Sequence, residues 1–243
     1  EWVEQYDEIF GDKVGKFFQS VLHTAAKLRR HAVPRMAALG NMPSSSSAMC
    51  ISPVGVVNAC NPRAAAAQAY GLAGLIHTYD VGFCQDGAAA FAPGATRDSV
   101  VDAAVAAIVP LSGAEMRGLV GDCMEVPRKT GDFKAFRAAV YARRDHFCQR
   151  ITCDSRETIP LTVALFWLAE GDVERSVTYG ANFGRDADTI ASMAGAIAGA
   201  LQGIDSIRSD WVDKALRVSA RDEEELACAL VSTALDTLRR LAG

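Results

Sequence analysis

The sequence predicts an all-α protein that forms one domain over residues 1–243. Half of the residues are hydrophobic, only 7% are aromatic, and alanine is the commonest residue. This composition suits helices that pack closely through small side chains, and it argues against a sandwich or a barrel. Several segments repeat apolar residues three and four positions apart, and none shows the alternation of a β-strand. A chain of this length can bury a large core.

Four helices are expected in the N-terminal half. The clearest start is at Asn61 and Pro62, because asparagine caps a helix and proline fits its first position. A loop over residues 40–47 and a buried apolar segment over 48–55 should come before it. The predicted helices cover residues 7–36, 61–77, 86–91 and 98–108.

The C-terminal half continues with helices of different burial. The helix predicted over residues 132–148 is amphipathic, and the helix over residues 160–169 is apolar enough to be buried on all sides. The last carries glutamates at its start and arginines at its end, which matches the helix macrodipole. The predicted helices cover residues 132–148, 160–169, 173–179, a segment that begins near Asp188, and 222–241.

Charge and cysteine content exclude several classes of protein. A net charge of −4 and a pI near 5.6 provide no basic surface for nucleic acid. The longest apolar run, residues 190–201, is shorter than the ~20 residues of a membrane span. Seven cysteines without a CxxC pair indicate reduced thiols. We therefore expect a cytoplasmic protein without a nucleic-acid or membrane partner, while the oligomeric state is left open.

Residues 182–203 concentrate the chemistry-bearing side chains at the entrance of a small, apolar helix. Asp186, Asp188 and Thr189 can converge ahead of its first turn. Carboxylate and hydroxyl oxygens are ligands that Mg²⁺ prefers, whereas the same residues can also simply cap free amides. Glycines at 195, 199 and 203 indicate that neighbouring helices approach this helix closely.

This segment resembles the C-terminal signature of the ADP-ribosylglycohydrolase family, whose common form is G-G-D-x-D-T-x-A followed by a small-residue helix. The match covers residues 184–191, with Arg185 in place of the second glycine. Residues 48–53, 76–78 and 157–160 resemble further family segments in the same order. The resemblance extends over about residues 14–203.

The resemblance implies an orthogonal multi-helix bundle that holds two Mg²⁺ ions, or Mn²⁺ in some members. Such a protein hydrolyses the bond between the anomeric carbon of ADP-ribose and a side chain or small leaving group. The metal ligands carried over are Asp186, Asp188 and Thr189, with Asp188 as the expected bridging carboxylate. Residues expected to contact the small-molecule or protein-linked substrate are Ser45, Ser46, Ser47, Met49, His77, Tyr79 and Arg185.

Four side chains carry a further interpretation. Arg185 is expected either to bind a phosphate group or to form an ion pair with Asp186, and the ion pair is preferred. Glu157 is a candidate for supporting the metal ligands from behind. Tyr79 is a candidate for stacking on a base, and His77 either contacts substrate or is satisfied within the core.

The sequence also departs from the family pattern. The family's N-terminal Thr/Ser-Asp-Asp ligands and gating glutamate have no counterpart before residue 14, so the chain resembles the C-terminal two-thirds of the domain. Serines 44–46 replace a G-N-G loop, and Cys50 replaces its arginine. Three alternatives follow: a non-catalytic relative that binds a nucleotide or a protein, a helical module in which the acidic residues only cap, and a phosphohydrolase that uses the same metals.

Overall fold

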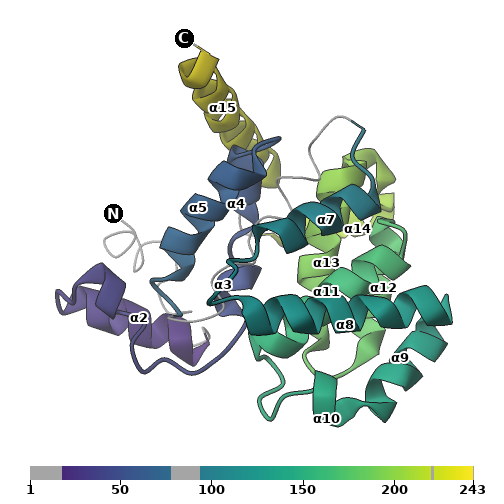
Figure 1. The fold of residues 1–243 in the computed structure, drawn as a ribbon. Coiled ribbons are helices and arrows are strands. Elements are labelled where there is room, and N and C mark those ends of the chain that lie inside the picture. The colour runs from purple at the N-terminus through teal and green to yellow at the C-terminus, as the bar shows by residue number, and fades with distance from the viewer. Residues whose placement is uncertain (1–17, 78–93, 220–221, 243) are drawn as a thin grey trace.

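The computed structural model describes residues 18–77, 94–219 and 222–242, and in these ranges the chain forms helices and turns without a strand (Figure 1). The predicted all-α class is therefore confirmed. None of the described helices combines the length and the apolar character that crossing a membrane requires. The helices of the N-terminal part are α2 (Gln19–Arg29), η2 (Pro34–Met36), α3 (Ser46–Met49), α4 (Ser52–Val57), α5 (Pro62–Ala73) and α7 (Arg97–Ala107).

The C-terminal part holds the bundle that positions the site. Its helices α8, α11, α12 and α13 lie side by side, whereas α15 extends away from them next to α4 (Figure 1). The helices are α8 (Ala114–Thr130), α9 (Phe133–Ala142), α10 (Arg144–Phe147), α11 (Ser155–Leu168), α12 (Val173–Phe183), α13 (Ala187–Gln202), η3 (Ile204–Ser206), α14 (Ser209–Val218) and α15 (Glu223–Ala242).

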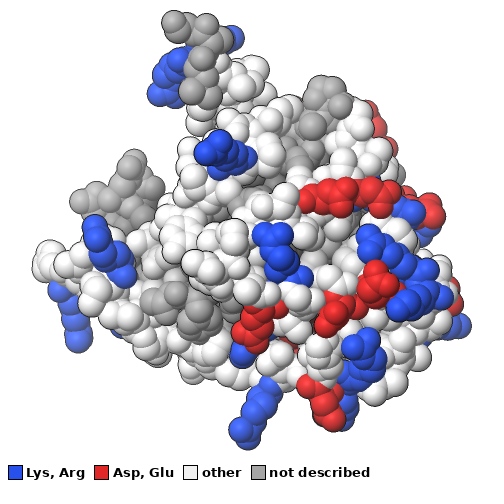
Figure 2. Space-filling model, viewed as in Figure 1, with Lys and Arg blue, Asp and Glu red and all other residues white. Residues whose placement is uncertain are grey.

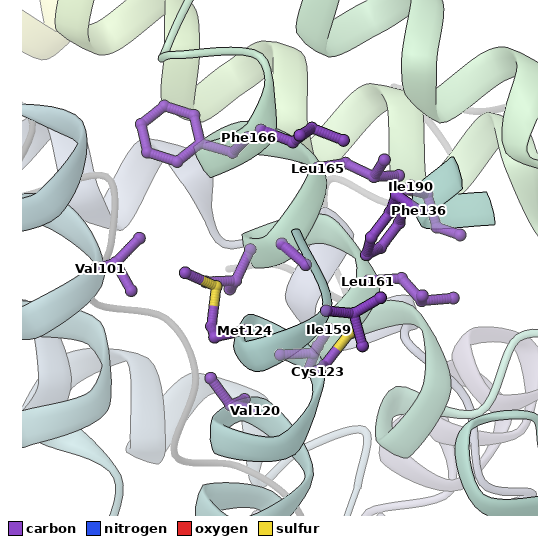
Figure 3. Packing of buried hydrophobic residues seen from close by; sticks show 14 of the residues in the cluster. Val101, Val120, Cys123, Met124, Phe136, Ile159, Leu161, Leu165, Phe166 and Ile190 are labelled. Carbon is purple, nitrogen blue, oxygen red and sulfur yellow. The ribbon is translucent and has the colours of Figure 1, made fainter. Parts of the chain in front are cut away.

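The hydrophobic core surrounds α11. Ile159, Leu161 and Leu165 of this helix are almost fully buried, and Phe136 of α9 and Ile190 of α13 pack into the same cluster (Figure 3). The predicted buried helix over residues 160–169 is confirmed, and it begins earlier, at Ser155, after the cap residue Asp154. A helix apolar on nearly every side is stable only in such a central position.

The prediction missed α8 altogether. This helix contains Gly118, Gly121 and Pro127, residues that weaken helix propensity. Its apolar side chains Val120 and Met124 are buried against α11 (Figure 3). Tertiary packing therefore overrides local propensity here.

Other predicted boundaries need correction. The helix expected to reach residue 36 ends at Arg29, because His31 adopts a φ of 61° and Pro34 begins a short 3₁₀ turn. The cap at Asn61 is confirmed, since its side chain accepts a hydrogen bond from the Ala64 amide at 3.1 Å, but α5 ends at Ala73. The helix over 132–148 divides into α9 and α10. The helix over 86–91 lies outside the described residues.

Small residues bring α12 and α13 into close contact. Of the glycines expected to allow such an approach, Gly195 is confirmed, whereas an added Cβ atom on Gly199 or Gly203 would meet nothing within 4 Å among the described residues. A Cβ atom added to Gly180 of α12 would lie 2.5 Å from the Cα atom of Ala191 in α13. A Cβ atom on Gly195 would lie 2.7 Å from a methyl group of Val177. These two helices carry the loop with the acidic residues between them, so their close packing holds that loop in place.

Replacing Gly180 with alanine should destabilise the protein by about 1–3 kcal/mol, because the added methyl group meets backbone atoms that cannot move aside independently. Gly199→Ala is the matched control: a Cβ atom there meets nothing within 4 Å, and alanine should leave stability unchanged or raise it by up to about 1 kcal/mol. Urea unfolding measures both, and equal stability of the two variants would contradict the close packing.

Candidate metal and substrate site

The loop between α12 and α13 is fixed by contacts to α9. The Nε atom of Arg137 donates to the Phe183 carbonyl at 2.7 Å, and the hydroxyl of Tyr141 donates to the same oxygen at 3.3 Å. Gly184 has a φ of 96°, and a Cβ atom there would lie 2.7 Å from the Tyr141 hydroxyl. Only glycine meets both conditions.

Arg185 pairs with Glu157, so the preferred pair with Asp186 is wrong. The Nε atom of Arg185 donates to Glu157 Oε1 at 2.6 Å, and Nη2 donates to Oε2 at 2.7 Å and also to the Gln149 carbonyl. Glu157 has no exposed surface, and its Oε2 accepts a further bond from the Gln149 amide at 2.6 Å. Hydrogen bonds to Glu157 raise the pKa of Arg185. This bidentate pair ties the loop to α11.

The pair also explains an unusual backbone. Arg185 has a φ of 62°, a region that residues other than glycine rarely adopt. The two charge-assisted bonds to Glu157 hold the residue in that conformation. The loop therefore reaches Asp186 in one defined direction, and Glu157 binds the residue directly before Asp186. Support of metal ligands by Glu157 stays a prediction.

Asp186 is the N-cap residue of α13, which begins at Ala187, but its side chain makes no capping bond. Its Oδ2 atom is buried and has no hydrogen-bond partner among the described residues. Burial raises the pKa of Asp186, the hydroxyls of Thr189 and Ser45 lower it, and the charges of Asp188 and Glu157 add to the increase. Buried carboxylate oxygens normally have a positively charged or hydrogen-bond-donating partner, and this oxygen lacks one among the described residues.

The other candidate ligands lie around it. Asp188 is in the first turn of α13 and exposed, whereas Thr189 is buried. The Thr189 hydroxyl donates to the sulfur of Met49 at 3.4 Å, which places the end of α3 against the start of α13. The structure thus brings Ser45, Met49, Asp186, Asp188 and Thr189 together at one helix entrance.

The serine run is divided between two environments. The Ser45 amide donates a hydrogen bond to the Cys153 carbonyl at 2.7 Å, and the Ser45 hydroxyl lowers the pKa of Asp186. Ser44 and Ser46 instead turn inward, where their hydroxyls lie 2.9 Å apart and both contact Ser20. The run is an ordered element that continues into α3, and not the loop that was expected to end at residue 47.

His77 belongs to this inner cluster. Its Nε2 atom lies 3.2 Å from the hydroxyl of Ser44, and only 2% of the residue is exposed. Burial lowers its pKa to about 4, against a smaller opposing effect of Asp154. The buried, internally bonded position fits the second interpretation of His77, and contact with substrate stays a prediction. Tyr79 lies outside the described residues.

The pKa of His77 predicts a loss of stability in mild acid. Because the ordinary value is 6.5 and the folded value about 4, the unfolded chain takes up the proton first as the pH falls. The contribution of neutral His77 to the free energy of unfolding is therefore fully present above pH 6.5, and it is lost as the pH falls towards 4. We expect a loss of about 2 kcal/mol between about pH 7.5 and about pH 4.5, with partial solvent screening included.

Urea unfolding at both pH values measures this loss. His77→Gln should make the unfolding free energy less dependent on pH, whereas His23→Gln, which alters an exposed histidine of α2, should not. An unchanged pH dependence in His77→Gln would contradict the assignment.

The oxygen donors of Asp186, Asp188 and Thr189 fit one side of a hydrated Mg²⁺ or Mn²⁺ ion. Two carboxylates and a hydroxyl are hard oxygen donors, and the unpartnered Oδ2 of Asp186 provides an unused acceptor. No group of three or more His, Cys, Asp or Glu side chains that could hold a metal ion occurs in the described part of the chain. The residues would therefore share such an ion with water or substrate oxygens.

Sequence reasoning missed several residues that support the site. Asp154 caps α11 and binds Arg156 through two bonds at 3.1 and 2.8 Å. Lys27 donates to two carbonyls and to Asn41, which in turn bonds the Ile76 carbonyl next to His77. The cap could have been found from the order Asp-Ser-Arg-Glu before an apolar run. The contacts of Asn41 span 35 positions and leave no local signal.

Comparison with known proteins identifies the family of this chain. The model of the ADP-ribosylglycohydrolase family matches residues 1–239, and the chain belongs to that family. A segment of 71 residues is 44% identical to a protein of Danio rerio named ADP-ribosylhydrolase ARH3, and it covers 29% of this chain and 16% of that protein. A segment of 84 residues is 38% identical to the uncharacterized protein YegU of Escherichia coli (strain K12), with coverage of 35% and 24%. The matched segments thus span less than a quarter of either relative.

Proposed function

We propose that this chain acts as a divalent-cation-dependent hydrolase that cleaves the glycosidic bond of an ADP-ribosyl or related ribosyl compound, free or attached to a protein. Membership of the ADP-ribosylglycohydrolase family supports the reaction class. The observation that carries the metal dependence is Asp186, whose buried Oδ2 atom has no partner in the described part of the chain. A bound cation would provide the missing partner.

Asp186, Asp188 and Thr189 would hold Mg²⁺ or Mn²⁺, with a second ion as the family resemblance implies. When bound, such an ion would offset negative charge and activate water for attack on the anomeric carbon. The chain's own contribution is orientation: the Glu157–Arg185 pair fixes the loop, and the Thr189–Met49 contact fixes α3 against α13. The Ser45 hydroxyl would donate to substrate or to Asp186.

The substrate would lie above this entrance. Met49 is 41% exposed, so it can offer an apolar contact there. Ser45, Ser46 and Ser47 stay predicted substrate contacts, although Ser45 and Ser47 are buried and Ser46 is bonded to Ser20 and Ser44. Arg185 uses Nε and Nη2 on the protein, which leaves Nη1 as its candidate for a phosphate. The backbone of Ser45 is held by the Cys153 carbonyl, and its side chain is buried next to Asp186.

The first test is a calorimetric titration of Mg²⁺ and Mn²⁺ into this chain and into Asp188→Asn. We expect micromolar binding that Asp188→Asn loses and that Asp205→Asn, an exposed control on η3, retains. Release of free sugar from ADP-ribosyl peptides and nucleosides should then depend on the metal. Equal binding by wild type and Asp188→Asn would refute the proposal, and release of phosphate in place of sugar would indicate a phosphohydrolase.

A second candidate is a relative that binds nucleotides without catalysis. It is favoured by the absence of a cluster of three metal-binding side chains among the described residues. Such a protein would bind ADP-ribose with equal affinity in the presence of Mg²⁺ and of a chelator, and no sugar would be released. The same calorimetry, repeated with ADP-ribose as the ligand, separates the two functions.

A further inference from the structure

A separate pocket lies between α9 and α12, on the side of the 183–186 loop that faces α9. It has a volume of about 340 Å³ and is lined by Phe133, Lys134, Arg137, Ala138, Tyr141 and Asn182. None of the residues assigned to substrate or metal lines it. Helix α9 lies at the end of the molecule opposite to α2 (Figure 1). The pocket is therefore a second candidate site.

The walls of this pocket combine flat rings with positive charge. The ring of Phe133 stacks on Tyr179 with centroids 4.8 Å apart and an angle of 11° between the planes. The guanidinium of Arg137 lies 5.0 Å from the centre of the Tyr141 ring. Both cations, Lys134 and Arg137, are on α9 three positions apart, which places them on the same face.

These cations have no carboxylate partner within the described ranges, and no acidic residue lines the pocket. The nearest acid in sequence, Asp132, directs Oδ1 to the amides of Lys134 and Ala135 as a helix cap. On the face seen in Figure 2, Lys and Arg side chains at the right lie among Asp and Glu side chains, whereas those at the left and top have no acidic side chain beside them. Two cations without a carboxylate partner among the described residues, in a hollow with aromatic walls, favour an anionic ligand.

Size narrows the ligand further. A volume of 340 Å³ is near the lower end of the ~300–1,000 Å³ typical of small-molecule sites. It suits one ring system with one anionic group, and not a dinucleotide such as ADP-ribose. We propose that this pocket binds a mononucleotide-sized organic anion, with its phosphate on Lys134 and Arg137 and its ring against Phe133 and Tyr141. This site does not depend on the proposed hydrolase activity.

The pocket is connected to the loop between α12 and α13 through Arg137 and Tyr141, which line the pocket and also donate hydrogen bonds to the Phe183 carbonyl. A test should therefore alter Lys134, which is exposed and lines the pocket, and for which no hydrogen bond or ion pair to that loop is found among the described residues. Lys129→Ala is the matched control, because this lysine of α8 is 75% exposed and lies outside the pocket.

Adenosine monophosphate and inorganic phosphate are titrated into the full chain by calorimetry, with a chelator present so that no metal contributes. We expect saturable binding of the nucleotide, competition by phosphate, and an affinity about tenfold lower in Lys134→Ala, the effect of losing one charge-assisted hydrogen bond. Lys129→Ala should bind as wild type does. Absence of nucleotide binding, binding of phosphate alone, or equal nucleotide affinity in Lys134→Ala would each overturn the proposal.

Discussion

Asp186→Asn is expected to abolish divalent-cation binding and lower sugar release more than 100-fold, while the metal-free protein becomes no less stable than wild type. The Oδ2 atom of Asp186 is buried without a partner in the described chain, and burial raises the pKa of this carboxyl. A neutral amide costs less to bury than an unpaired carboxylate. We therefore expect Asp186 to contribute to metal binding and not to the stability of the metal-free fold.

Thermal unfolding with and without Mg²⁺ or Mn²⁺ measures both effects. An ion at about 100 times its Kd should stabilise wild type by about 2.7 kcal/mol and should leave Asp186→Asn unchanged. Asp205→Asn, on the exposed turn η3, should respond to the metal as wild type does. If metal-free Asp186→Asn unfolds well below wild type, Asp186 has a structural role that its unpartnered oxygen does not indicate.

Glu157→Ala should destabilise the protein by about 3–5 kcal/mol, because it leaves the partly buried guanidinium of Arg185 without its partner. The variant also removes the two bonds that hold Arg185 at a φ of 62°. The loop should then relax, and metal affinity should fall about 10- to 100-fold, as it does when residues behind metal ligands are altered. Urea unfolding and calorimetry provide the two measurements.

Glu115→Ala is the control for this variant. Glu115 lies 3.5 Å from Arg156 in an ion pair and is 65% exposed, so its loss should cost about 0–1 kcal/mol and should not affect metal binding. A Glu157→Ala protein as stable as Glu115→Ala would show that the pair with Arg185 does not hold the loop. Unchanged metal affinity in a folded Glu157→Ala protein would refute only the role of Glu157 in positioning the candidate metal ligands, and its effect on stability would stand.

Several elements follow directly from local sequence. Asn61, Asp132 and Asp172 cap α5, α9 and α12 as their residue types predict, because a cap needs only a side-chain acceptor and the next few amides. The approach of α12 to α13 follows from glycine and alanine, whose small volume is visible in the sequence. These features need no information from distant segments.

Other features have no local signal. Helix α8 forms although it contains Gly118, Gly121 and Pro127, since its apolar face is buried against α11. The Asp188 side chain is near the helix start as predicted, but it is exposed, whereas Asp186 is the acid with a buried, unpartnered oxygen. Which of two neighbouring carboxylates is buried depends on the elements packed above them.

By itself, the sequence determined the all-α class, the caps of several helices, the family signature over residues 184–191 and the set of candidate ligands, because each depends on neighbouring residues. The tertiary structure alone decided that Arg185 pairs with Glu157 and not with Asp186, a contact across 28 positions. It also decided that Ser44 turns inward to His77 while Ser45 faces Asp186. Adjacent side chains diverge in this way because burial and charge are set by segments that meet only in the folded chain.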